Sequence, residues 1–265
     1  MKRHFFLKNL WSPPDYERRD FGSSPSIVSV KKDVNHILWS LRFQSVRRYL
    51  NQKYWEKETA DALYSEKIDS LPRIESLADH SWHVADIVLL VGAHFTKLDL
   101  NKCVQLAVLH DKLELIMGDK NPLGRDGTGL KTHAFNPIKG ADKLKLERLA
   151  LDEYTQKLGL EARAVQSPLF QEILDKRTPE ALFVSAIDKL QPLTYILAKK
   201  RGALDNEHIL FTLHYSHKSV AYFPSLFPYY KELTARLLSS VSRFRKISRS
   251  DLLDQLEDGQ MPLFL

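Results

Sequence analysis

The sequence has little that would tie it to an oxidising compartment or to a membrane. It has one cysteine, Cys103, in 265 residues, which excludes a disulfide within the chain and suits a reducing compartment. The longest apolar run lies around residues 87–93, far short of the roughly 20 residues that a membrane-spanning helix needs. The basic start, MKRHFFLKNLW, has too short an apolar stretch for a secretory signal peptide. We therefore expect a cytoplasmic protein that has no membrane partner.

Glycine-rich phosphate loops and strand patterns are also missing. No Gly-Lys-Ser or Gly-Lys-Thr occurs, so a P-loop is excluded, and no internal repeat is visible. A hydrophobic content of 43% suffices for a full core, and the length suits one large domain or one domain with appendages. The formal charge of +6 favours anionic ligands such as nucleotides, nucleic acid or acidic lipid heads, without choosing among them.

The segment AVLHDKLELIMGD concentrates ionisable side chains within an apolar stretch. His110 and Asp111 are adjacent, Glu114 follows one helical turn after His110, and Asp119 comes just after Gly118. The apolar spacing predicts one continuous helix that ends at Gly118, with His110 and Glu114 on the same inward face. Imidazole and carboxylate groups in such a place are costly unless they are paired or bind a cation.

Two further polar residues interrupt apolar helical segments elsewhere in the chain. His80 lies in ADHSWHVADIVLLVGAHF, and Asp188 lies in ALFVSAIDKLQPLTYIL. Together with His110 and Asp111, they give the order His, His-Asp, Asp along three apolar helices. Two imidazole nitrogens and two carboxylate oxygens are a donor set that suits a divalent transition metal. The sequence therefore predicts a metal site built from three separate helices.

This pattern resembles the HD-domain metal-dependent phosphohydrolases, and more narrowly their deoxynucleoside 5′-monophosphatase branch. The resemblance rests on RIESLADHSWHVA, on HDKLELIMGD and on the aspartate of SAIDKLQ, and it covers roughly residues 68–200. It implies an all-α HD-domain helical bundle with extra N- and C-terminal helices, and one divalent ion (Mn, Co, Fe, Zn or Mg). The implied metal ligands are His80, His110, Asp111 and Asp188.

The function that the resemblance implies is hydrolysis of a small phosphate monoester, with a (deoxy)nucleoside 5′-monophosphate preferred. Glu114 would then orient or deprotonate the attacking water, and Asp119 would protonate the leaving oxygen. The monophosphatase branch usually carries an Arg beside a Trp upstream of the first ligand, near the sugar. Here that region reads ALYSEKIDSLPR and has no Trp, so a preference for a deoxy sugar is left open.

Four basic residues are candidates for holding the substrate phosphate. Arg73 precedes His80 by seven residues, a place that belongs to the active-site region in the similar family. A structural pairing of Arg73 with a carboxylate such as Glu75 is an equal alternative. The loop KNPLGRDGTGLKTHAFNPIKG leaves the metal site and could close over a phosphate, or be a plain surface insertion. Its candidate phosphate ligands are Lys120, Arg125 and Lys139.

The expected organisation has three parts. Residues 1–59 form an N-terminal arm and helical extension, 60–200 the HD domain, and 201–265 a C-terminal helical extension that packs on it. Hydrophobic spacing and capping residues predict the individual helices. Their expected ranges are 34–50, 56–70, a helix beginning near 80, 139–158, 170–176, a helix beginning at 178, 206–217, 229–245 and 249–256.

Three other function classes compete with the phosphohydrolase. One is a regulatory module that binds a nucleotide without turnover, against which the presence of Glu114 and Asp119 argues. The N-terminal segment interleaves basic and aromatic residues, which would suit a nucleic-acid-binding HD nuclease, although core aromatics and solvated bases are the favoured interpretation. An HD-fold di-iron oxygenase would need further ligands, for which His83, His133 and the C-terminal histidines are the available residues. The expected partner is a nucleotide or another phosphorylated small molecule, and the extensions leave room for a homodimer.

Overall fold

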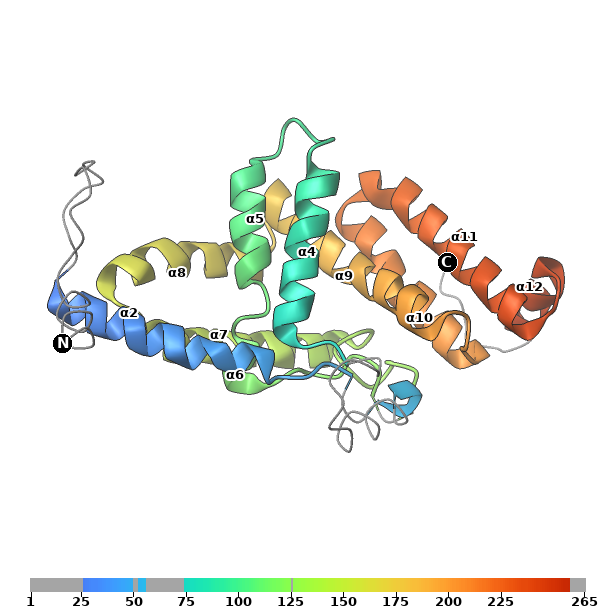
Figure 1. Cartoon of the computed structure of the whole chain (residues 1–265), viewed down its shortest axis with the longest axis horizontal. Helices are drawn as coiled ribbons and strands as arrows, with labels where there is room; N and C mark the ends of the chain where they lie inside the picture. The colour runs from blue at the N-terminus through green and yellow to red at the C-terminus, as the bar shows by residue number, and fades with distance from the viewer. Residues whose placement is uncertain (1–25, 50–51, 56–73, 125, 258–265) are drawn as a thin grey trace, which may run out of the picture.

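The computed structural model describes residues 26–49, 52–55, 74–124 and 126–257, and in these ranges the chain forms helices joined by loops (Figure 1). Within the same ranges, the one β-type pairing is an isolated bridge between Arg47 and Ser76. The expected all-α class is confirmed. The expected helix 56–70 and the candidates Arg73 and Arg125 lie outside the described residues.

The α-helices are α2 (Ile27–Ser40), α4 (Leu77–Gly92), α5 (Leu100–Leu109), α6 (Glu114–Met117), α7 (Pro137–Gln156), α8 (Leu160–Asp175), α9 (Pro179–Lys200), α10 (Asn206–Tyr222), α11 (Phe227–Arg245) and α12 (Arg249–Glu257). The 3₁₀ helices are η1 (Leu41–Gln44), η2 (Lys53–Trp55) and η3 (Pro224–Leu226).

Helices α4, α5 and α9 meet at the centre of the molecule and enclose one hydrophobic cluster (Figure 1). Helix α4 begins at a capping box, in which Ser76 and Asp79 satisfy each other's backbone N–H groups. Its fully buried Val84 and Val88 then pack against α5 and α9. Because all three helices are anchored by this cluster, the polar residues that interrupt their apolar faces are held close together.

Helix α9 is the longest element and packs on both sides. Thr178 caps its start by accepting the N–H of Ala181, and Pro179 occupies the first turn, as the sequence predicts. Its other flank packs against α10 and α11 in a second hydrophobic cluster. A Cβ at Gly202 would lie 2.3 Å from the Ser240 carbonyl oxygen, so the turn after α9 can approach α11 this closely only with glycine.

Three expected helices have different limits in the structure. The continuous helix up to Gly118 is wrong, because α5 ends at Leu109 and tight i to i+3 backbone bonds follow before the single turn of α6. The helix expected at 34–50 instead runs from Ile27 to Ser40 and continues as η1. Helix α8 extends back to Leu160 with Pro168 in its interior, whereas a short helix at 170–176 was expected.

The aromatic residues of the N-terminal segment contribute mainly to the core. Phe43, Tyr49 and Trp55 are all buried, and the Tyr49 ring stacks on Tyr195 with 5.3 Å between ring centroids. This arrangement agrees with the favoured interpretation that these rings are structural, because a buried ring cannot stack on a nucleic-acid base. Among the described helices, none combines the length and the apolar character needed to cross a membrane.

Candidate metal centre

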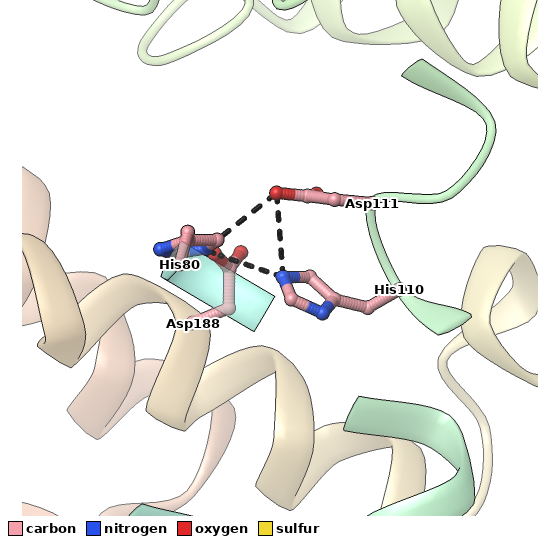
Figure 2. A group of neighbouring side chains, drawn as sticks. All are labelled: His80, His110, Asp111 and Asp188. Atoms are coloured by element: carbon pink, nitrogen blue, oxygen red, sulfur yellow. Dashed lines mark hydrogen bonds and ion pairs between the residues drawn. The ribbon is translucent and has the colours of Figure 1, made fainter. Parts of the chain in front are cut away.

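Four side chains from α4, the end of α5 and α9 converge on one point (Figure 2). They are His80, His110, Asp111 and Asp188, and one ligand atom from each lies within 4.8 Å of all the others. The Nε2 atom of His80 is 3.1 Å from Oδ1 of Asp188 and 3.5 Å from Oδ2 of Asp111. The Nε2 atom of His110 is 3.4 Å from the same oxygen of Asp111. The structure thus brings together all four residues that the sequence suggested as ligands.

The early end of α5 explains how two adjacent residues reach the same point. In a regular α-helix, neighbouring side chains diverge and do not face each other. Here the N–H of Lys112 bonds to the carbonyl of Leu109 and that of Glu114 to the carbonyl of Asp111, both at 2.9 Å. This tighter turn directs His110 and Asp111 together toward α4 and α9. The break in the helix is therefore a feature of the site.

Both imidazole rings are oriented by acceptors that lie outside the centre. The Nδ1 atom of His110 is 2.6 Å from the carbonyl oxygen of Ala107, which can only accept, so Nδ1 carries the proton. The Nδ1 atom of His80 is 3.0 Å from Oε1 of Gln191, whose Nε2 donates to Glu75 at 2.6 Å. In the neutral form of each ring, the Nε2 atom is therefore unprotonated and faces the centre, where a cation can bind it.

The donor set fits a divalent cation. His80 is fully buried, and Nε2 of His110 is buried without a hydrogen-bond partner in the described part of the chain. An unprotonated imidazole nitrogen in such a place lacks a donor, and a metal ion would supply the missing interaction. Burial raises the pKa of Asp188, but the positive charges beside it, first of all the Lys189 ammonium at 2.6 Å, hold it well below its usual range. That carboxylate is ionised and available to a cation.

Two acidic residues flank the four converging side chains on different sides. Glu114 lines a cavity of about 70 Å³ together with His110, Asp111 and Asp188. Asp119 lines a separate cavity of about 30 Å³. Burial and the charge of Asp111 raise the pKa of Glu114 well above its usual range, although Lys143 lies 3.5 Å from its Oε1. Burial likewise raises the pKa of Asp119, against the opposing effect of Arg48.

Arg48 is the site residue that the sequence did not reveal. Its Nη1 donates to Oδ2 of Asp111 at 3.0 Å, and its Nε is 3.4 Å from Oε2 of Glu75. Backbone bonds hold it there, since the N–H of Arg48 bonds to the carbonyl of Glu75 and that of Leu77 to the carbonyl of Val46. The sequence suggested a solvated base within a basic segment. No local signal separates Arg48 from its neighbours, because the contact joins residues far apart in the chain.

The other basic side chains at the centre also differ from the expected ones. Lys120 and Lys139 are exposed, and Lys139 pairs with Asp142 at 3.6 Å on the first turns of α7. Neither lysine lines either of the two cavities. One turn further along α7, Lys143 reaches Glu114, and Lys189 lies 2.6 Å from Oδ2 of Asp188. The cations beside the four converging residues are therefore Arg48, Lys143 and Lys189.

The other described histidines do not join this cluster. His83 lies near it, but its Nδ1 accepts from the amide of Gln191 at 3.1 Å. His208 is buried and stacks on Tyr54 with 4.3 Å between ring centroids, and His214 stacks on Phe135. Within the described residues, one group alone has the arrangement of a metal site, and it contains neither His83 nor His133.

Curated relatives resemble part of this chain. A 5′-deoxynucleotidase of Schizosaccharomyces pombe is 28% identical over 132 residues, which cover 48% of this chain and 59% of that protein. A 5′-deoxynucleotidase of Xenopus laevis is 30% identical over 131 residues, covering 48% and 58%. A third, from Dictyostelium discoideum, is 29% identical over 141 residues, covering 50% and 68%. The match to the first two thus spans less than two thirds of their length.

The fold and a family model agree with these similarities. A crystal structure from Magnetospirillum magnetotacticum, named a predicted metal-dependent phosphohydrolase, superimposes with a TM-score of 0.50 at 19% identity. The superposition covers 77% of this chain and 94% of the other, and it bears on the fold alone. The model of the HD domain matches residues 68–225, which is more than half of the chain and includes all four converging residues. The chain belongs to the HD-domain family.

Proposed function

We propose that this protein is a divalent-metal-dependent phosphohydrolase that acts on a small phosphate monoester, with nucleoside 5′-monophosphates as the preferred class. In this proposal one metal ion is held by His80, His110, Asp111 and Asp188. The observation that carries it is the orientation of the two imidazoles, whose unprotonated Nε2 atoms face two carboxylates. Core packing does not require such an arrangement of imidazoles and carboxylates, whereas binding of a cation does.

A bound divalent ion would polarise the phosphoryl group and lower the pKa of water near it. The residues around it have separate tasks. Asp111 and Asp188 supply the negative charge that retains the cation. Arg48 and Lys189 each contact one of these carboxylates, which limits the excess of negative charge that a phosphate must approach. The site can therefore accept an anionic substrate without strong repulsion.

Glu114 is suited to receive the proton of the attacking water. Its Oε1 lies near Lys143, while its Oε2 is buried and has no hydrogen-bond partner among the described residues. An oxygen in this condition is free to accept a proton from a water molecule in the larger cavity. Lys143 also lies 3.3 Å from Glu147, so it is held in place between two carboxylates.

Asp119 and Arg48 are suited to the opposite side of the phosphate. Burial raises the pKa of Asp119, which is the direction that donation of a proton to the leaving oxygen requires. Arg48 lines the same small cavity and carries a planar guanidinium that can bind two phosphate oxygens. In this assignment, Arg48 takes the phosphate-binding role that the sequence suggested for Lys120 and Lys139.

Nucleotides are the preferred substrates because the similar proteins from three organisms are named 5′-deoxynucleotidases. Their similarity covers about half of this chain, and the separate match of the HD-domain model, over residues 68–225, includes all four proposed ligands. The identity of the base and the number of phosphates are best settled by assay, since the cavities beside the centre are small.

The test is phosphate release from a panel of ribo- and deoxynucleoside mono- and triphosphates, with Mn²⁺, Co²⁺, Mg²⁺ or a chelator. We expect metal-dependent release that disappears in Asp111→Ala together with the bound metal, measured by elemental analysis. The exposed Asp254 on α12 gives a matched control, because Asp254→Ala should change neither quantity. Release that survives in Asp111→Ala, or silence across the panel with metal bound, would overturn the proposal.

A further inference from the structure

A small cavity lies beside Arg48 and Asp119, separate from the larger cavity that Glu114 lines. Its volume of about 30 Å³ holds one or two water-sized groups and is too small for a heterocyclic base. The walls come from the segment after η1, the loop after α6, and helices α9 and α10. Because Asp119 belongs to this cavity and Glu114 to the other, the small cavity lies on the leaving-group side in the proposed function.

Three buried hydroxyl groups line this small cavity. They belong to Tyr49, Thr212 and Ser216, which are 6%, 2% and 0% exposed. None of the three hydroxyl oxygens has a hydrogen-bond partner among the described residues. Thr212 and Ser216 are four residues apart on α10, so they lie on one face of the helix. Leaving several hydroxyls unpaired in one place is unfavourable, which suggests that a ligand or ordered water completes them.

Tyr49 is held in position by its neighbours. Its backbone has φ of 63°, in the left-handed region that a bulky residue rarely adopts. Its ring packs against both Tyr195, stacked at an interplanar angle of 3°, and Trp55, whose centroid is 4.7 Å away, and these two rings also stack on each other. Strained residues of this kind persist when the surrounding structure imposes them, and they occur preferentially at functional sites. The hydroxyl of Tyr49 is therefore fixed at the cavity.

We propose that the small cavity receives a hydroxyl group of the substrate's sugar, so that the protein prefers ribose-containing phosphate esters over their deoxy analogues. This inference rests on the proposed function, which puts the leaving alcohol next to Asp119. A hydroxyl both donates and accepts hydrogen bonds, as do the three groups that line the cavity. In the proposed function the phosphate itself lies at the metal centre, within reach of Arg48, so that the sugar is the part of the substrate that extends toward this cavity. An apolar group there would leave all three hydroxyls unpaired.

The expected preference for ribose arises because a deoxy analogue would leave the hydroxyl groups of the cavity without a hydrogen-bond partner. A site built to bind a hydroxyl rejects the analogue that lacks it much more strongly than an apolar pocket rejects an added hydroxyl. We expect kcat/KM for AMP to exceed that for dAMP by about tenfold or more, since more than one hydrogen bond is lost. The pair ribose 5-phosphate and 2-deoxyribose 5-phosphate should show the same order, and comparing the two pairs separates recognition of a nucleotide from recognition of a sugar phosphate.

The test compares Thr212→Val and Ser216→Ala with the wild-type protein, all loaded with Mn²⁺, on both substrate pairs. Each variant should lower kcat/KM for the ribose substrate by about 3- to 10-fold and leave the deoxy substrate unchanged. Ser219→Ala is the matched control. Ser219 is a fully buried serine on α10 whose hydroxyl also has no partner in the described part of the chain, but it does not line the cavity. Its replacement should leave the ratio of the two substrates unaltered.

The outcomes separate this inference from the proposed function. Phosphate release with equal or greater activity on dAMP, or an equal loss on both sugars in the variants, would overturn the inference and leave the phosphohydrolase intact. If no phosphate is released at all, the proposed function fails, and binding of AMP and dAMP to the Mn²⁺-loaded protein by calorimetry still decides the inference. Tighter binding of AMP that is weakened by Ser216→Ala would support it, and equal binding would overturn it.

Discussion

The polar groups of the four converging residues and those of the small cavity beside them differ in whether the protein supplies their hydrogen-bond partners. At the metal centre, the protein itself supplies an acceptor for each imidazole Nδ1, from Ala107 and from Gln191. In the small cavity, the hydroxyls of Thr212 and Ser216 have no partner among the described residues. The contrast teaches that this fold fixes the orientation of groups that would hold an ion, while it leaves open the groups that would contact a replaceable molecule.

The largest expected effect comes from replacing Glu114, which lines the larger cavity beside the metal centre. Glu114 has one carboxylate oxygen near Lys143 and one without a partner among the described residues. We expect Glu114→Gln to lower kcat by about 10²- to 10⁴-fold, because the proton acceptor is lost while the shape is kept. Metal content should be unchanged, and the exposed Glu257→Gln should behave as wild type. A variant that loses its metal along with its activity would show instead that Glu114 supports the metal centre.

A smaller effect is expected when the orientation of one imidazole is disturbed. Gln191 is fully buried and connects His80 to Glu75. Gln191→Leu removes the acceptor for Nδ1 of His80, and we expect metal affinity to fall by about 10- to 100-fold. The measurement is a titration against a competing chelator, with the exposed Gln156→Leu as control. Unchanged affinity would mean that packing alone orients His80.

The third prediction uses a histidine that has no carboxylate beside it. His208 lines the small cavity, and burial together with the charge of Lys200 lowers its pKa from 6.5 to about 3. The unfolded chain therefore binds a proton that the folded protein does not, so the contribution to stability is complete above pH 6.5 and decreases as the pH falls. At pH 5 the loss amounts to about 2 kcal/mol.

Urea unfolding of His208→Gln at several pH values checks this sign. The free energy of unfolding should depend less on pH between 6.5 and 5 in the variant than in the wild-type protein. The exposed His94→Gln is the control, and it should keep the wild-type dependence. An unchanged slope in His208→Gln would show that other groups dominate the acid sensitivity.

The sequence predicted the metal centre because the information is local. His80, Asp188 and the pair His110-Asp111 each interrupt an apolar segment, so that each is expected near a common core. The capped start of α9 was predictable for the same reason, since Thr178 and Pro179 act within one turn. What periodicity missed is the end of α5 at Leu109, where tight turns replace the regular helix.

Contacts between distant segments could not be predicted from the sequence. Arg48 meets Asp111 only because the backbone around Val46 pairs with that around Glu75. The hydroxyls of Thr212 and Ser216 lie in a region where the resemblance assigned no function, and nothing in their sequence neighbourhood distinguishes them from other serines and threonines. The HD-domain model matches residues 68–225, and the expected division of the chain at residue 200 stays a prediction.

The hydrophobic cluster behind the small cavity contains both Trp55 and Ile74. The spacing between these two residues is set by the core and by the pairing of Val46 with Leu77. Arg48, which follows Val46 by two residues, therefore owes its place beside Asp111 to this core.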